Sequence, residues 1–480
     1  MVAAHFLALI ALLVAPGAAA AQRAASLSAA DSALVGRILL AEDRRDSTDA
    51  ALDEGMRHAD PRVRVIARRA RWRIVDPRFA ARDSLPPLAA PPSYPDPPWR
   101  VRYRNLQARR TDCDALRAAM ADSAWPVRLR AADLTPTGCF ANEGLAAILR
   151  SWVDNLPKDA SRRSSGGVSW HAGAHGVLAL ARVRPEEARP RVRWLATHRQ
   201  WQLRVAAARA AAMVSDTARL RALARDVDDN VKEAAIEGLS SLTGHADDAL
   251  YLAALRARGA QAVRAAAIAL RGSPRPDVAR RAAAAFERWV ARANASERDA
   301  RVALLAAAGR PASDDRPPPV RSELPPRAVA LALGDDVRLR VTMAPSTGGG
   351  GSFVVRLRGD VAPMMAARVL ALARAGYYNG TSWHRVEHDF VIQGGGHGAN
   401  EYVGYRQFFR DELGTVPHVR GTVGMSTRGH DTGDAQWFVN LKDNLRLGRD
   451  YTVFAEVVDG IEVVDGVMEG DVIARIEEVR

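Results

Sequence analysis

The sequence predicts a multidomain protein: an all-α array of helical repeats, then a closed β-barrel of short strands. Three observations lead to this fold class. Ala, Leu, Val and Arg dominate the segment from Ala29 to Arg310, where period-2 alternation never persists. Six prolines then fall within Pro311–Pro326. Beyond them, short β-branched runs alternate in hydrophobicity and are separated by glycine, as is typical of strands.

Composition excludes some classes of protein. The 480 residues are 48% hydrophobic and include 2 Cys, so the chain is neither a disulfide-stapled miniprotein nor a disordered protein. The formal net charge of +13 is unevenly distributed. Residues 327–480 hold 17 Lys and Arg against 20 Asp and Glu, a net charge of −3, so residues 1–326 carry +16. The positive charge therefore belongs to the helical part and its linker.

The N-terminus has the pattern of a secretory signal peptide, which we place at residues 1–21. Residues 2–21 lack charged side chains, and the apolar run Phe6–Val14 precedes the small residues Ala18–Ala21. This run is shorter than the roughly 20 residues of a membrane span, and we expect no integral membrane span elsewhere. An uncleaved N-terminal anchor is the alternative. We expect an exported protein, periplasmic or secreted, with no nucleic-acid partner.

A degenerate repeat runs through residues 22–310, the predicted helical-repeat domain. Phrases of the type Val-Arg-x-Ala-Ala recur, and their starts differ by 64, 76, 28 and 32 residues; they begin at Val63, Val127, Leu203, Val231 and Val263. A repeat of about 30 to 38 residues accounts for these spacings if each of the two long intervals contains one further, degenerate unit. The pattern resembles short HEAT-like repeats, a resemblance that implies a protein-binding scaffold. An irregular Ala-rich helical bundle is the alternative.

The spacing of cysteines and histidines in this region indicates no catalytic or metal site. Cys113 and Cys139 lie 26 positions apart, about one repeat, and are expected to form a disulfide in an oxidising compartment or to remain two buried thiols. His171 and His175 have the spacing of two ligands on one helix face, but no Glu follows His171 and no third ligand is evident. We therefore predict no metal and no cofactor.

The proline-rich stretch at residues 311–326 predicts an extended linker, and residues 327–480 a separate β-domain. Alternation in 337–343 and 353–358 predicts a hairpin, and 362–375 an amphipathic helix. Further strands are expected at 451–458 and 472–479. About 155 residues of short strands with one or two helices are typical of a closed barrel.

Three blocks of this β-domain resemble the cyclophilin peptidyl-prolyl isomerases. They are GYYNGTSWHRVEHDFVIQGGG at 376–396, GTVGMSTR at 421–428 with DAQWFVN at 434–440, and YTVFAEVVDG at 451–460. The resemblance covers residues 328–480. It implies an eight-stranded antiparallel barrel with two helices, an activity that accelerates Xaa-Pro isomerisation in protein clients, and no cofactor.

The resemblance also implies a set of site residues. Arg385 is the expected catalytic cation, because its guanidinium is always charged and can donate a hydrogen bond to the prolyl nitrogen as the amide twists. Phe390 and Gln393 complete the expected catalytic group. Substrate-binding positions are expected at His384, Val391, Thr427, Gln436, Phe438, Leu447 and Tyr451. Val391 stands where the family often has Met, and Trp437 where it has Phe. Arg446 lies near the position of a Trp that contacts cyclosporin in many members, which puts sensitivity to that inhibitor in doubt.

Three functions fit these observations. The first is an exported isomerase whose helical array captures client proteins. The second is a non-catalytic scaffold that recognises Pro-containing segments, which a peptide isomerisation assay would distinguish. In the third, the basic array binds an anionic lipid or polysaccharide, and its retention would then be salt-sensitive.

Overall fold

The computed structural model describes residues 27–75, 92–156, 169–316, 322–345, 350–448 and 450–479. The predicted signal peptide lies outside these residues, as does part of the predicted linker. Among the described residues, no helix is long and apolar enough to cross a membrane.

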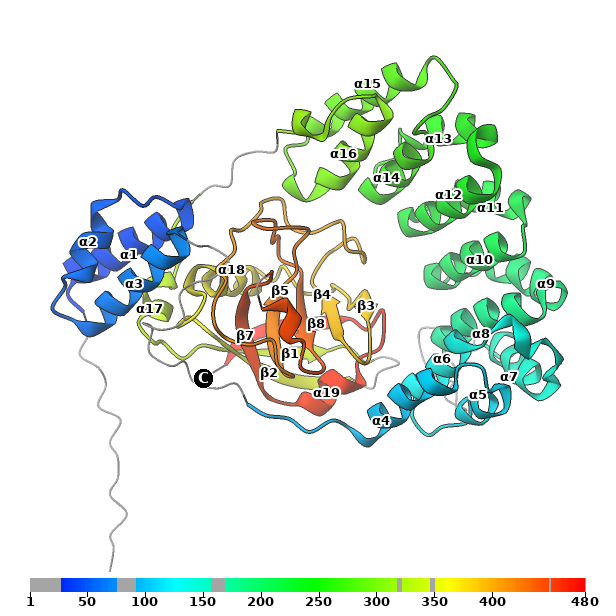
Figure 1. Cartoon of the computed structure of the whole chain (residues 1–480), viewed down its shortest axis with the longest axis horizontal. Coiled ribbons are helices and arrows are strands. Elements are labelled where there is room, and N and C mark those ends of the chain that lie inside the picture. Colours follow the sequence, from blue (N-terminus) through cyan, green and yellow to red (C-terminus); the bar gives the residue numbers. More distant parts are fainter. Residues whose placement is uncertain are drawn as a thin grey trace, which may run out of the picture.

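Helices α4 to α16 form a curved array, called the arc below (Figure 1). Its α-helices are α4 (Pro98–Asn105), α5 (Cys113–Ala119), α6 (Trp125–Leu134), α7 (Glu143–Asp154), α8 (Trp170–Val183), α9 (Pro185–Leu195), α10 (Trp201–Met213), α11 (Thr217–Leu223), α12 (Asp229–Thr243), α13 (Asp248–Ala254), α14 (Ala260–Ala269), α15 (Val278–Val290) and α16 (Arg298–Ala307). Short 3-10 turns lie at η1 (Leu106–Arg109), η2 (Thr137–Ala141), η3 (Gly244–Asp247), η4 (Ala295–Glu297) and η5 (Ala312–Asp314).

Alternate helices of the arc pack side by side. Helix α8 contacts α10, α10 contacts α12, and the series continues through α14 to α16. These helices form the inner row, whereas α9, α11, α13 and α15 lie on the outer side (Figure 1). One apolar core rich in alanine runs along the arc, from Leu106 to Ala307. Small side chains permit this close helix contact, and an Asp228 N-cap accepts hydrogen bonds from the amides of Asn230 and Val231 at the start of α12.

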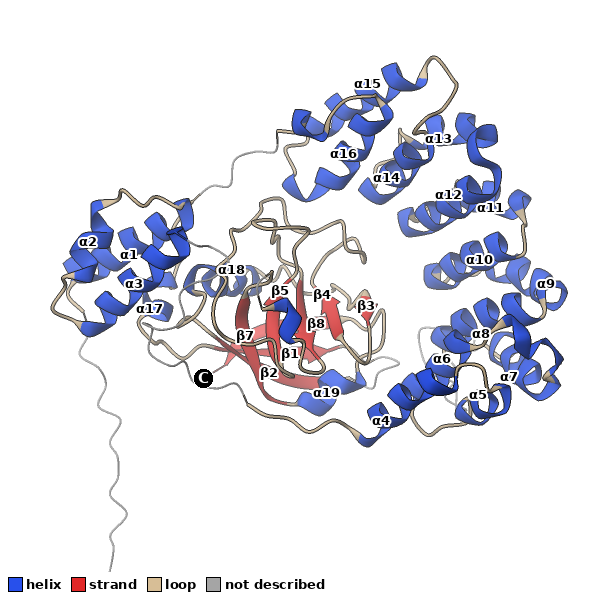
Figure 2. Ribbon diagram, viewed as in Figure 1, coloured by secondary structure: helices blue, strands red, loops and turns tan. Residues whose placement is uncertain are grey.

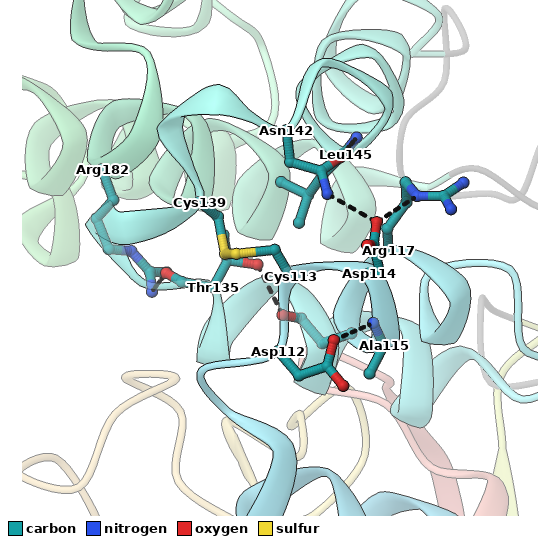
Figure 3. Close-up of a disulfide and its surroundings, with 11 residues drawn as sticks. Asp112, Cys113, Asp114, Ala115, Arg117, Thr135, Cys139, Asn142, Leu145 and Arg182 are labelled. Carbon is teal, nitrogen blue, oxygen red and sulfur yellow. Dashed lines mark hydrogen bonds and ion pairs between the residues drawn. A yellow bond between two sulfur atoms is a disulfide. The ribbon is translucent and has the colours of Figure 1, made fainter.

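A disulfide joins Cys113 and Cys139 near the first helices of the arc. Figure 3 shows it linking the start of α5 to η2, beside a hydrogen bond from the Asn142 amide to the Asp114 carboxylate, 3.1 Å long. For a loop of this length, chain entropy alone gives a stabilisation of about 3.5 kcal/mol.

The β-domain contains one antiparallel sheet of eight strands, curved into a half-barrel (Figure 2). Its order is β3-β4-β6-β5-β7-β2-β1-β8. The strands are β1 (Arg338–Met343), β2 (Gly351–Leu357), β3 (Arg385–Val386), β4 (Val391–Gly394), β5 (Thr422–Met425), β6 (Trp437–Asn440), β7 (Val453–Asp459) and β8 (Ile473–Val479). Its helices are α17 (Ala328–Ala332), α18 (Pro363–Arg374) and α19 (Ile461–Gly466), with a 3-10 turn η6 (Leu445–Leu447).

Three N-terminal helices pack on the β-domain rather than on the arc, which differs from the single helical domain expected over 22–310. They are α1 (Ala29–Arg44), α2 (Ala50–Met56) and α3 (Pro61–Val75). Their apolar residues, such as Ile38 and Ile66, share one core with the β-domain. A repeat phrase predicts a helix with one apolar face, but it does not specify which neighbour covers that face.

A buried ionic network joins these helices to the β-domain. Glu42 is 1% exposed and accepts hydrogen bonds from the guanidinium groups of Arg69 and Arg73. Arg73 also donates to the carbonyls of Leu413 (2.7 Å) and Val361 (2.8 Å) in the β-domain. Burial alone would raise the pKa of Glu42, but the two arginines hold it below its ordinary value.

The arc surrounds one side of the β-domain (Figure 1) and contacts it through several of its helices, among them α8, where the His171 ring lies 2.6 Å from the Glu469 carbonyl. Near its first helix, Arg100 donates to the carbonyls of His388 (2.8 Å) and Leu441 (2.9 Å). At α12, Asn230 bonds Asn400 at 3.1 Å. At the last helix, Arg428 of the β-domain forms an ion pair of 2.8 Å with Asp299. The arc is therefore held against the β-domain at its first and last helices and at helices between them.

Candidate functional site

A pocket of about 180 Å³ lies on the β-domain, and one of its lining residues, Arg428, pairs with Asp299 of the arc. Its apolar part is a buried cluster of Val391, Phe438 and Leu447, against which Phe390 and Tyr451 pack. The rings of Phe438 and Tyr451 meet edge to face, with centroids 5.6 Å apart. Of the ten sequence-predicted site residues, eight line this pocket: Arg385, Phe390, Val391, Gln393, Thr427, Phe438, Leu447 and Tyr451.

Strand register places these side chains together. Arg385 lies opposite Gln393 in the β3–β4 pair, and Gln393 lies opposite Phe438 in the β4–β6 pair. On β5, Gly424 is the neighbour of Phe438, and a Cβ at this position would lie 2.4 Å from the Phe438 ring. Glycine is therefore required at position 424 for the Phe438 ring to form the pocket wall.

The Arg385 guanidinium lies at the polar rim of the pocket. It donates to the Glu387 carboxylate at 2.8 Å and forms an ion pair of 3.3 Å with Glu401. A longer contact, 3.4 Å, reaches the amide oxygen of Gln393. The Arg385 side chain is 36% exposed, so a ligand in the pocket can reach its charge.

The two remaining predicted residues stand behind the rim. Gln436 accepts a hydrogen bond from Gln393 at 3.3 Å and donates to the carbonyls of Asn400 and Val403, so it fixes both the Gln393 amide and the adjacent loop. His384 lines a neighbouring cavity instead of this pocket. Burial first, and then the charge of Arg385, lower the pKa of His384 to about 4, so its ring is neutral at pH 7.

Three pocket residues are not among those predicted from the sequence: Glu401, Ser426 and Arg428. Ser426 and Arg428 flank the predicted residue Thr427, so their position next to it in the sequence indicates that they belong to the same pocket. Glu401 carries no comparable signal, because it belongs to a loop that the arc positions. Among the described residues, no group of three or more His, Cys, Asp or Glu could hold a metal ion.

The site thus combines a small apolar pocket on an antiparallel half-barrel with an accessible cation at its rim, an arrangement suited to a compact apolar group beside a polar one. A family model for "Cyclophilin type peptidyl-prolyl cis-trans isomerase/CLD" matches residues 341–479. A peptidyl-prolyl cis-trans isomerase of Helicobacter pylori is 32% identical over 130 residues, which are 26% of this chain and 80% of that protein.

A second relative has the same printed activity. Peptidyl-prolyl cis-trans isomerase B of Escherichia coli is 36% identical over 126 residues, covering 24% of this chain and 77% of the relative. A Cryptosporidium parvum cyclophilin structure, 22% identical with a TM-score of 0.28, spans 30% of this chain and 99% of its own. The chain belongs to the cyclophilin-type peptidyl-prolyl cis-trans isomerases, and it is an enzyme of that class.

Proposed function

We propose that this isomerase is an exported folding catalyst, with the arc as a HEAT-like solenoid that captures clients and the β-domain as a closed barrel that isomerises their Xaa-Pro bonds. Hydrogen bonds from Gly380 to Ile473 (2.8 Å) and from Trp383 to Asp471 (2.9 Å) support closure, because they connect the two edges of the sheet. Inner-row helices that begin at Trp170, Trp201, Asp229, Ala260 and Arg298 support a repeat of two helices per unit.

In the proposed mechanism, the pocket acts on the resonance of the prolyl amide. Uncatalysed rotation faces a barrier of about 18 to 20 kcal/mol, because the C–N bond has partial double-bond character. The apolar cluster of Val391, Phe438 and Leu447 holds the proline ring. Twisting localises the nitrogen lone pair, and Arg385 donates a hydrogen bond to it, an interaction that is stronger in the transition state than in the planar ground state.

Polar groups around the ring hold the flanking peptide during this rotation. Gln393, fixed by Gln436, can bond a substrate backbone group, and Thr427 also lines the pocket. The activity needs no nucleophile and no metal, because no covalent bond is made or broken. The non-catalytic scaffold is therefore the less favoured alternative: the pocket combines the apolar grip with an accessible donor.

The observation that carries the client-capture role is that the inner row of the arc faces the rim of the pocket. A cavity between them is lined by residues of α8, α10 and α12 on one side and by Arg385 on the other. A client chain bound along the arc would therefore lie next to the catalytic cation. The partner on the basic arc is, in this proposal, the client itself.

Capture can be tested by removing an apolar contact from the inner row. Trp201 on α10 lines the cavity, whereas Trp194 on the outer helix α9 is 45% exposed and does not line it. We expect Trp201→Ala to weaken binding of a permanently unfolded, reduced and alkylated protein by about tenfold, the loss of one aromatic contact. Trp194→Ala should leave this affinity unchanged. Equal affinities for both variants, in titrations of the full chain, would reject capture by the inner row.

Export can be tested on the mature protein. If residues 1–21 are a signal peptide, the protein recovered from cells that produce it naturally should begin at Ala21 or Gln22 and be found outside the cytoplasm. Mass spectrometry of the intact protein measures this directly. A protein that retains Met1 and stays in the cytoplasm would contradict the proposal.

A further inference from the structure

A second cavity, of about 540 Å³, lies between the arc and the β-domain. Helices α8, α10 and α12 line one side through residues such as Trp170, Trp201 and Glu233. His384, Arg385 and Glu401 line the other side. Its volume falls in the range of about 300 to 1,000 Å³ that is usual for ligand sites.

This cavity adjoins the pocket of about 180 Å³ described above. Arg385 and Glu401 line both, and their ion pair of 3.3 Å lies where the two meet. A volume of 540 Å³ corresponds to a length of about 8 Å, which holds two to three residues of extended chain. A peptide with its proline in the pocket would therefore place its neighbouring residues in the cavity.

Carboxylates dominate the lining of this cavity. Five are present, namely Asp133, Glu233, Glu237, Glu401 and Glu469, against the two arginines Arg209 and Arg385. His175 donates to Asp133 at 2.6 Å and offsets that charge. Arg264 is shared between Glu233 (3.1 Å) and Glu237 (3.7 Å), so the carboxylates remain in excess.

The two carboxylates of α12, Glu233 and Glu237, have too few neighbouring cations to balance their negative charge. Burial first, and the neighbouring Glu237 second, raise the pKa of Glu233 to about 7, as expected where two acids share one arginine. Burial likewise raises the pKa of Glu469. On the opposite wall, the buried, neutral ring of His384 has one acceptor nitrogen. The lining thus holds more carboxyl groups than cations, and a cationic donor would complement them and favour their charged form.

We infer that this cavity is a specificity site for an Arg or Lys side chain located within about three residues of the client's proline. This inference rests on the proposed client-binding role of the arc. The cationic side chain binds Glu233 and Glu237, while Trp170 and Trp201 cover its aliphatic stem. It also competes with Arg385 for Glu401, and so releases the Arg385 guanidinium toward the prolyl nitrogen.

The test compares matched Xaa-Pro peptides that carry Arg, citrulline or Glu within three residues of the proline, on either side. Citrulline keeps the shape of arginine without its charge. For the full-length wild type, we expect kcat/KM from exchange NMR to be about tenfold higher for one Arg peptide than for its citrulline partner at low salt. The ratio should fall toward one in 0.5 M NaCl, as the charge is screened.

Substitutions in the cavity test whether its carboxylates cause the preference for arginine over citrulline. In the double variant Glu233→Gln, Glu237→Gln, and separately in Glu401→Gln, the Arg-to-citrulline ratio should fall to about two or less. The control is Glu186→Gln, Glu287→Gln, which makes the same charge change at residues 81% and 67% exposed on the outer helices α9 and α15. It should keep the wild-type ratio. Glu401 is 46% exposed on a loop, so its variant keeps the test valid if the α12 variant unfolds.

Two results would overturn the inference: a wild-type ratio near one on both sides of the proline, or a ratio that survives the variants at Glu233, Glu237 and Glu401. These failures are distinct from failure of client capture. Capture fails if Trp201→Ala does not weaken binding of an unfolded protein. If capture holds and the ratio is one, only the preference for basic residues is rejected.

Discussion

Substitution of Arg385 by alanine is expected to lower kcat/KM for an Xaa-Pro peptide by about 10²- to 10³-fold, the usual cost of removing one preorganised donor from a transition state. The guanidinium is 36% exposed at the rim and packs over the Phe390 ring at 5.8 Å, so its removal leaves the apolar cluster in place. Binding of the proline ring should therefore persist while the rate falls. Exchange NMR and proline-limited refolding of a test protein both measure this loss.

Two further substitutions show whether the loss of activity comes from removing the guanidinium of Arg385 itself. Arg385→Lys keeps the positive charge but loses the planar fork, and it should retain an intermediate activity. Arg475 on β8 is 58% exposed and pairs with Glu477, so Arg475→Ala controls for the loss of one surface arginine and should match wild type. An Arg385→Ala variant within threefold of wild type would show that the donor lies elsewhere.

The second large effect is expected at Glu42, on stability. Glu42→Ala should lower the free energy of unfolding of the β-domain by about 3 to 5 kcal/mol. The substitution leaves two guanidinium groups, Arg69 (5% exposed) and Arg73 (1% exposed), buried without their shared carboxylate. Native-state hydrogen exchange of the β1 and β2 amides reports this loss, because it resolves the β-domain from the arc.

A surface ion pair of the same helices provides the matched control. Glu54 is 53% exposed and pairs with Arg37 at 2.7 Å. Because water screens such a pair, Glu54→Ala should cost less than about 1 kcal/mol. Equal effects of Glu42→Ala and Glu54→Ala would mean that the buried network does not hold the N-terminal helices on the β-domain.

Local sequence patterns predicted where the helices and strands of this protein lie, but not which other element each of them packs against. The repeat phrases at Leu203, Val231 and Val263 fall in α10, α12 and α14, all in the inner row of the arc. The phrase at Val63 has the same composition but lies in α3, which packs on the β-domain. Helical periodicity fixes which face is apolar, whereas the identity of the covering element depends on contacts distant in sequence.

At the site, too, residues in contiguous segments were predicted, whereas residues positioned by contacts distant in sequence were not. Eight predicted residues line the pocket because they belong to contiguous segments that strand register brings together. Glu401 was missed, since its loop is positioned by contacts such as Asn230 to Gly398, separated by 168 positions. The second cavity was missed for the same reason: two thirds of its lining belongs to the arc, far in sequence from the residues of the β-domain that face it.

The buried network between α3 and the β-domain also constrains the order of folding. Arg73 donates to Leu413, 340 positions further along the chain, so the core of the catalytic domain is discontinuous in sequence. Contacts of the arc are local, between neighbouring helical pairs, and can form as soon as each pair leaves the ribosome. Helices α1 to α3 must wait for the last strand. The catalytic domain therefore completes its core last, after the arc that surrounds it has already formed.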